Sequence, residues 1–226
     1  MMRLVGSEFF EGTTMDPKAI VKARSRCRLA EDAFSKLDSC EKYLDFCDFW
    51  YQFLINASGI FTVLEQGAKM DQRCFNWYGN KKSERKRDPL LSYFHHARNS
   101  DEHGLDFGTE VTPNKFIGGI KAEGASRRFM DEGGNIYEDV GAAFELTNVN
   151  PSDIPKFTSL DGKPVSSQFT PAKISLVAVT DRGRVYHPPN EHLGTPMNVT
   201  NPVEAAAILL EYLRHLIDEA EGFRRP

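Results

Sequence analysis

The stretch YLDFCDFWYQFLINASGIFTVLEQ, residues 43–66, decides how we expect this chain to fold. We expect a helix that begins after Ser39, and its aromatic and aliphatic residues fall on more than one of its faces. A helix with apolar side chains on several faces is buried among other elements. The stretch therefore predicts the middle helix of a helical bundle.

Three further helix starts carry one common signature, a capping side chain followed by proline. They are Asp16-Pro17, Asp88-Pro89 and Asn201-Pro202, and proline suits the first helical position. We expect helices from about Pro17 to Leu37, from Pro89 to a glycine stop at Gly104, and from Pro202 to Glu221. The basic segment GNKKSERKRD, residues 79–88, is interpreted as a linker.

Composition changes after the helix that is expected from Pro89. From Leu105 to about Val199 the chain is rich in glycine, proline and short β-type runs at 114–120, 133–140 and 172–187. The last run is a hairpin candidate with residues 181–184 as its turn, and 151–171 is interpreted as a surface loop. The pattern predicts a mainly α, α+β fold, in which a four-helix bundle of residues 1–105 and 199–226 carries a β-rich insertion at 106–198.

Composition excludes several classes of protein. The net charge of -4 gives no general nucleic-acid signature, so a binding face for an anionic partner would be a local patch. The four cysteines form no CxxC pair, the first twelve residues do not resemble a signal peptide, and no apolar run is long enough to span a membrane. These features predict reduced thiols and a cytoplasmic protein. No Walker-type, GxSxG or strand-linked GxGxxG motif indicates a nucleotide cofactor.

The helix from Pro89 ends in SYFHHARNSDEHGL, residues 92–105. Asp101 and Glu102 would oppose the negative end of the helix dipole there. Residues that break such a local rule concentrate at functional sites. The alternative is that the helix has already ended near Asn99.

The core of this stretch, Arg98-Asn99-Ser100-Asp101-Glu102-His103, resembles the R-x4-6-H signature of the HEPN superfamily, which are small helical-bundle proteins common in bacterial toxin and defence systems. Four residues separate the arginine from the histidine, and the residue after the arginine is polar. The resemblance covers about residues 15–105 and 199–224, and it implies a HEPN-like four-helix bundle. The β-rich insertion departs from the compact form of that family.

The resemblance implies a metal-independent endoribonuclease without a cofactor. His103 would be the acid or base, Arg98 the clamp on the phosphate, and Asn99 would orient one of them or the scissile phosphate. Histidine titrates near neutral pH, and arginine offers a fixed fork of donors to phosphate oxygens. RNA would be the substrate, with an antitoxin or another protein as a further partner.

Assembly as a homodimer is predicted on two grounds. Positions five apart on a regular helix are rotated by about 140°, so Arg98 and His103 share a site only if the helix breaks or two copies of the motif meet. The resemblance favours two copies. The second ground is an apolar surface on the helix from residue 43, which one intramolecular neighbour cannot easily cover. Its members are Phe46, Phe49, Trp50, Phe53, Ile55, Ile60 and Phe61.

A cluster of basic residues precedes the motif: Lys81, Lys82, Arg85, Lys86 and Arg87. It is either a solvated linker or an electrostatic track for RNA phosphates, and its closeness in sequence to Arg98 favours the track. His96 with His103, and His187 with His192, are two weaker candidate pairs of metal ligands, and we expect no metal.

Other interpretations stay open. Arg98 could simply pair with Asp101 or Glu102, with His103 as a cation at the helix end. The chain could be a non-catalytic HEPN-like module for dimerisation and for binding a partner or nucleic acid. It could also be an α+β protein that binds a small ligand in its β-rich segment.

Overall fold

The computed structural model describes residues 15–40, 42–104, 107–119, 127–130, 134, 136–139, 144–147, 158–159 and 166–223. The fold is mainly helical with short strands, so the predicted α+β class is confirmed. The chain divides into two compact units, one of residues 1–110 and 176–226 and the other of residues 111–175. None of the helices in the described part is long and apolar enough to cross a membrane.

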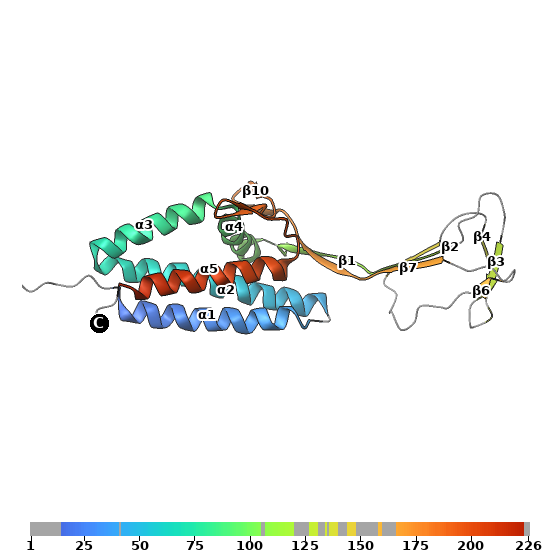
Figure 1. Ribbon diagram of the computed structural model, residues 1–226, viewed down its shortest axis with the longest axis horizontal. Coiled ribbons are helices and arrows are strands. Elements are labelled where there is room, and N and C mark those ends of the chain that lie inside the picture. The colour runs from blue at the N-terminus through green and yellow to red at the C-terminus, as the bar shows by residue number, and fades with distance from the viewer. Residues whose placement is uncertain are drawn as a thin grey trace, which may run out of the picture. The chain divides into compact units, whose positions relative to one another are not determined.

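Among its described residues, the first unit has five α-helices and one short 3-10 helix, which Figure 1 shows packed together. They are α1 (Pro17–Leu37), α2 (Tyr43–Gly67), η1 (Ala68–Met70), α3 (Gln72–Arg87), α4 (Pro89–His103) and α5 (Pro202–Glu221). The bounds predicted for the first and last helices, and the glycine stop at Gly104, are confirmed. The three predicted caps form as well, because Asp16, Asp88 and Asn201 each accept a hydrogen bond from a backbone N–H of the following turn.

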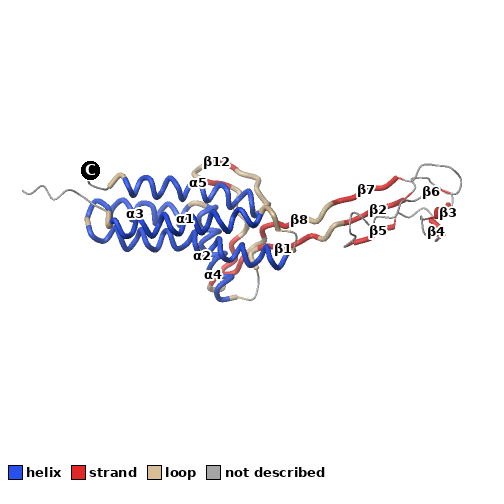
Figure 2. Tube along the Cα trace, turned by 90° about the horizontal axis from the view of Figure 1, so that it is seen from below, coloured by secondary structure: helices blue, strands red, loops and turns tan. Residues whose placement is uncertain are grey.

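The helix α2 occupies the middle of this unit, as its sequence predicts. It packs on α1, α4 and α5, and Figures 1 and 2 show α1, α2 and α5 side by side. Trp50, in the first half of α2, is fully buried, and its ring lies 5.6 Å from that of Phe94 on α4. The apolar faces of several helices therefore meet on α2.

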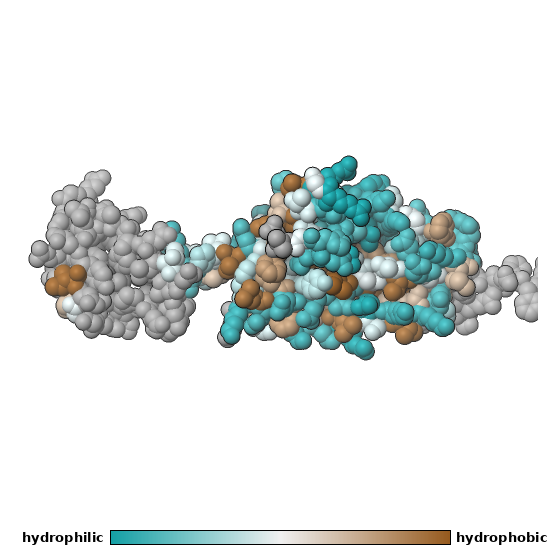
Figure 3. Space-filling model, turned by 180° about the vertical axis from the view of Figure 1, so that it is seen from behind, coloured by the Kyte–Doolittle hydropathy of each residue, from teal (hydrophilic) through white to brown (hydrophobic). Residues whose placement is uncertain are grey.

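The apolar surface that was the second ground for a dimer is not present, so that argument was wrong. Phe46, Trp50, Phe53, Ile60 and Phe61 are all buried within the single chain, and Phe49 and Ile55 are half-buried. On the face of the first unit seen in Figure 3, hydrophilic residues predominate and hydrophobic residues are scattered. The helices α1, α3, α4 and α5 all contact α2, where the prediction considered one neighbour.

The basic segment 79–88 is not a linker, so that prediction was wrong. It forms the second half of α3, whose start is capped by Asp71. Lysine, arginine and glutamate are strong helix formers, and Arg85, Lys86 and Arg87 lie in the last turn, where positive charge is favourable. A high charge density was mistaken for the absence of regular structure.

The strands are short. They are β1 (Thr109–Thr112), β2 (Lys115–Gly119), β3 (Arg127–Met130), β4 (Ile136–Asp139), β5 (Phe144–Thr147), β6 (Thr158–Ser159), β7 (Ser166–Thr170), β8 (Lys173–Leu176), β9 (Val179–Asp181), β10 (Arg184–Tyr186), β11 (Glu191–His192) and β12 (Thr195–Pro196). They pair in the orders β1-β8, β10-β9, β11-β12, β5-β2-β7 and β4-β3-β6.

In the second unit, β2 is the central strand of an antiparallel sheet and pairs with both β5 and β7. The expectation of a surface loop at 151–171 was wrong for residues 166–170, which form β7, and for 158–159, which form β6. Such strands depend on partners distant in the sequence, which local propensity does not show. Residues 151–157 and 160–165 lie outside the described part of the chain.

After the second unit, the chain re-enters the first unit at Leu176, earlier than the predicted residue 199. The reason is that β9 and β11 pack against α4. Asp88, buried at the start of α4, accepts hydrogen bonds from His192 Nδ1 at 3.1 Å and from the backbone N–H of Leu193 at 2.7 Å. The hydroxyl of Tyr93 on α4 donates to the carbonyl of Val177 at 2.8 Å. Hydrogen bonds at the start of α4 and in its second turn thus hold residues 177–193 against this helix.

Candidate active site

The helix α4 continues without a break through the motif. It ends at His103, and the N–H of Gly104 donates to the carbonyl of Ser100. A Cβ on residue 104 would lie 2.5 Å from that carbonyl oxygen, which explains the glycine. The alternative that the helix ends near Asn99 was wrong, and so was the idea of a broken helix between Arg98 and His103.

Arg98, Asn99 and His103 nevertheless line one hollow in a single chain. Its volume is about 290 Å³, and the other lining residues are Ser100 and Gly104 from α4 and Thr180, Asp181 and Arg182 from the strand β9 and the turn after it. The strand β9 packs on α4, so residues of the hairpin and of the end of the helix line the same space. The three residues chosen from the sequence are therefore brought together.

The guanidinium of Arg98 is held by two neighbours on its own helix. Its Nη1 lies 2.6 Å from Oε2 of Glu102 and donates to Oδ1 of Asn99 at 3.2 Å. Its Nε is buried and has no hydrogen-bond partner among the described residues. The predicted alternative of a pair with Glu102 is thus present in the structure, alongside the position of Arg98 in the hollow.

His103, at the last position of α4, is open to solvent. Its side chain is 74% exposed, and Nε2 lies 3.8 Å from Oε2 of Glu102. An imidazole in such a place can exchange protons with a ligand that enters the hollow. Asp101 on the same turn is different, because burial raises the pKa of its carboxyl group.

Asp181 links the hairpin to the motif. Its carboxylate is 8% exposed, and its Oδ2 accepts hydrogen bonds from Nδ2 of Asn99 at 2.9 Å and Nδ1 of His96 at 2.7 Å. Burial by itself would raise the pKa of Asp181, but these two hydrogen bonds and the nearby positive charges hold it below its ordinary value. Asp181 is therefore ionised near neutral pH and can only accept hydrogen bonds.

Arg182 is a second member of the hollow that the sequence did not single out. The hairpin turn predicted at 181–184 is confirmed, with Asp181 paired to Arg184. Arg182 and Gly183 have φ values of 51° and 76°, as in the type I′ turn that suits a two-residue hairpin. The side chain of Arg182 is 91% exposed. The sequence indicated the turn, but not its position beside a helix that ends about eighty residues earlier.

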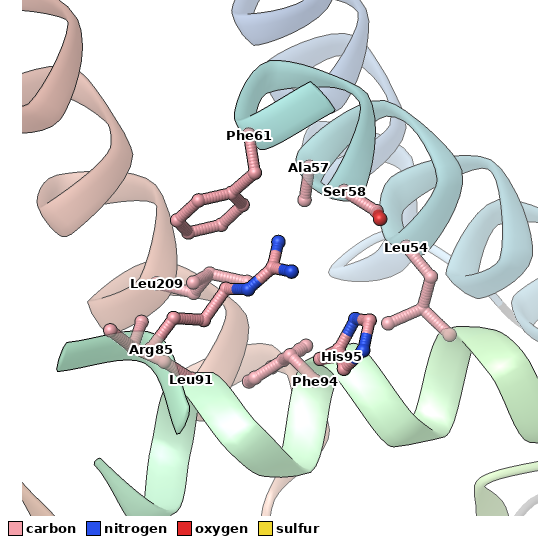
Figure 4. Close-up of a pocket in the computed structure, with 9 residues that line it drawn as sticks. All are labelled: Leu54, Ala57, Ser58, Phe61, Arg85, Leu91, Phe94, His95 and Leu209. Carbon is pink, nitrogen blue, oxygen red and sulfur yellow. The ribbon is translucent and has the colours of Figure 1, made fainter. Parts of the chain in front are cut away.

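His95, next to the motif, is placed differently from His103. It lies beside a cavity of about 10 Å³, the room that one water molecule needs, into which its ring and the guanidinium of Arg85 both point (Figure 4). Burial, together with the positive charges of Arg85 and His96, lowers the pKa of His95 to about 4. His95 is therefore neutral near pH 7 and is a poor candidate for an acid.

A consequence for stability follows from this histidine. The unfolded chain protonates His95 near its ordinary pKa, whereas the folded chain does so only near 4, so the unfolded state binds more protons between these values. Unfolding free energy should fall as the pH is lowered from about 7.5 to about 5, and the fall should be smaller in a His95→Leu variant. Urea unfolding at both pH values measures this. His187→Leu, at an exposed position, is the control and should keep the wild-type pH dependence. The same dependence in His95→Leu would contradict the lowered pKa of His95.

The basic cluster before the motif is largely engaged in contacts within the chain. Lys81 pairs with Glu219 at 3.0 Å, Lys82 pairs with Glu65 at 2.6 Å, and Arg85 lies 4.6 Å from the centre of the Phe61 ring. Lys86 and Arg87 are exposed. None of the five lines the hollow. The predicted RNA track therefore shares no residue with the lining of this hollow and stays a prediction.

The two weaker candidate pairs of metal-binding histidines each have a member with another partner. His96 pairs with Asp181, and His192 pairs with Asp88. Across the described ranges, no three histidine, cysteine, aspartate or glutamate side chains are grouped so that they could hold a metal ion. All four cysteines are free thiols.

Comparison with known proteins found no matching family model, no matching curated protein and no matching solved structure.

Proposed function

We propose that this protein is a metal-independent endoribonuclease of the HEPN type, acting in a toxin or defence system and built on a HEPN-like helical bundle. One observation supports the proposal most: Arg98, Asn99 and His103 line the same open hollow, together with Arg182. Three of these four side chains are basic, which suits an anionic ligand such as a phosphodiester.

The chemistry assigns a role to each group. The 2′-oxygen of RNA attacks the neighbouring phosphorus, the bond from phosphorus to the 5′-oxygen breaks, and the products carry a 2′,3′-cyclic phosphate and a 5′-hydroxyl. His103 exchanges the proton that the 2′-hydroxyl loses or the 5′-oxygen gains. Arg98 and Arg182 stabilise the negative charge that grows on the phosphate oxygens. Asn99 orients Arg98 through the hydrogen bond between them.

We also propose that two copies of the chain act together. One histidine cannot both take and give a proton in one concerted step, and a second motif facing the first would supply another imidazole. This argument rests on His103 alone, since the apolar surface expected on α2 is buried. Light scattering after size exclusion tests this proposal. A mass near 25.5 kDa at all concentrations would show a monomer and would contradict the two-copy site.

A non-catalytic HEPN-like module is the second candidate, and one observation favours it. Glu102 lies 2.6 Å from Arg98 and 3.8 Å from His103, and its negative charge weakens the attraction of both for a phosphate. Such a module would bind RNA or a partner protein and leave RNA intact. The third candidate, a small-ligand site in the β-rich segment, concerns side chains that lie mostly outside the described residues.

Cleavage assays distinguish the two main candidates. Single-stranded and structured RNA are incubated with the protein in EDTA, and the ends of the fragments are analysed. Fragments with 2′,3′-cyclic phosphate and 5′-hydroxyl ends in EDTA would support the nuclease. Binding without cleavage would support the module, and cleavage that needs a divalent ion would contradict the proposed mechanism.

Arg182 gives a prediction about substrate affinity. Arg182→Ala should weaken binding of RNA about three- to tenfold and reduce its dependence on salt, because one contact to phosphate is lost. Arg28→Ala, an exposed change on α1 outside the hollow, is the matched control. Fluorescence anisotropy with labelled RNA at several salt concentrations measures both effects. Equal affinities for the two variants would show that Arg182 does not contact RNA.

A further inference from the structure

The amide of Asn99 is held between two groups of opposite hydrogen-bonding character. Its Nδ2 donates to Oδ2 of Asp181 at 2.9 Å, and its Oδ1 accepts from Nη1 of Arg98 at 3.2 Å. An amide side chain can turn over and exchange its oxygen and nitrogen. Turned over, Asn99 would direct its oxygen at a carboxylate and its N–H groups at a guanidinium, and both contacts would be repulsive.

Asp181 is itself fixed in place. It is the last residue of β9, it is paired across the hairpin with Arg184, and its carboxylate is buried. The same Oδ2 accepts from Nδ1 of His96, whose ring stacks on Tyr186 of β10 at 3.5 Å between ring centres. A carboxylate that is buried and held by two donors has little freedom to turn, so it selects a single orientation of Asn99.

We propose that Asp181 is a positioning residue of the candidate active site, which fixes the amide of Asn99 and, through its oxygen, the guanidinium of Arg98. This inference rests on the proposed nuclease function. The hairpin β9–β10 is then part of the site, because it places the carboxylate of Asp181 beside the motif residue Asn99. Oδ2 of Asp181 is occupied by Asn99 and His96, so this oxygen serves to position the amide of Asn99.

Two replacements of Asp181 separate positioning from charge. Asp181→Ala removes the acceptor, so the amide of Asn99 loses its fixed orientation and the guanidinium of Arg98 keeps only its contact with Glu102. The rate of cleavage at saturating RNA should therefore fall about 10- to 100-fold. Asp181→Asn keeps an acceptor oxygen at the same position and should retain most of the rate. An equal loss in both variants would overturn positioning through an acceptor. Asp218→Ala, an exposed aspartate paired with Arg24, is the matched control.

A double-mutant cycle tests the route through Asn99. If Asp181 acts by orienting that amide, Asp181→Ala should cost little further activity in an Asn99→Ala background. Full additivity of the two losses would overturn the proposal. The same cycle with His96→Ala should leave most of the loss from Asp181→Ala in place, because His96 does not lie on the route to Arg98. Circular dichroism confirms that each variant is folded.

A measurement that does not depend on RNA cleavage tests the positioning of Asn99 separately from the proposed function. In NMR spectra, the side-chain amide protons of Asn99 should be shifted and protected from exchange in the wild type and in Asp181→Asn. They should move to solvent-like positions in Asp181→Ala. Solvent-like signals in the wild type would overturn the positioning of Asn99. A wild type that shows the protected amide but cleaves no RNA would contradict the nuclease, and Asp181 would then orient a binding site only.

Discussion

Alanine at Arg98 or at His103 is expected to abolish cleavage of RNA, with a loss of about 10²- to 10⁴-fold for each variant. Removing His103 removes the group that exchanges protons, and its exposed position at the end of α4 means that little packing is lost. Removing Arg98 removes the guanidinium that stabilises the phosphate. The two groups act in one step, so the double variant should be little worse than either single one.

Matched controls exist on the same chain. Arg28→Ala on α1 and His187→Ala are changes at exposed residues outside the hollow, and both should keep full activity. Circular dichroism should show wild-type helix content for all four single variants. Full activity in Arg98→Ala or His103→Ala would refute the proposed roles, and loss of helix content would show that folding, and not chemistry, had been changed.

Alanine at Trp50 should have the largest effect on stability. This side chain is fully buried, and its ring lies between 5.6 and 6.3 Å from the rings of Phe46, Phe53 and Phe94. Replacing it with alanine removes these contacts and leaves a cavity, so the free energy of unfolding should fall by about 3–5 kcal/mol. That is a large part of the stability of an ordinary domain. Urea unfolding followed by circular dichroism measures the change.

Phenylalanine at the same position should cost clearly less than alanine. It keeps most of the aromatic volume, and the indole N–H that it removes is buried and has no hydrogen-bond partner among the described residues. Removing an unpaired buried donor also removes the free-energy cost of keeping that donor away from water. Trp77→Ala is the matched control, because that ring is only half-buried. Equal losses for alanine at positions 50 and 77 would contradict the central place of α2.

The sequence was informative where local chemistry decides structure. Capping side chains before Pro17, Pro89 and Pro202 marked the helix starts, because a cap satisfies backbone N–H groups within its own turn. The Asp-Arg-Gly-Arg turn was found for the same reason, since glycine supplies the positive φ that the hairpin needs. Charge alone was misleading in α3, where basic residues form a helix and not a linker.

By itself, the sequence determined the helical class of the fold, most helix bounds and the motif residues Arg98, Asn99 and His103. Only the tertiary structure decided that these three line one hollow, and that Asp181 and Arg182 complete it. The physical reason is the range of the interactions: caps and turns act over two to four residues. The contact from Asn99 to Asp181 joins positions 82 apart, and it forms only because the returning chain packs against α4.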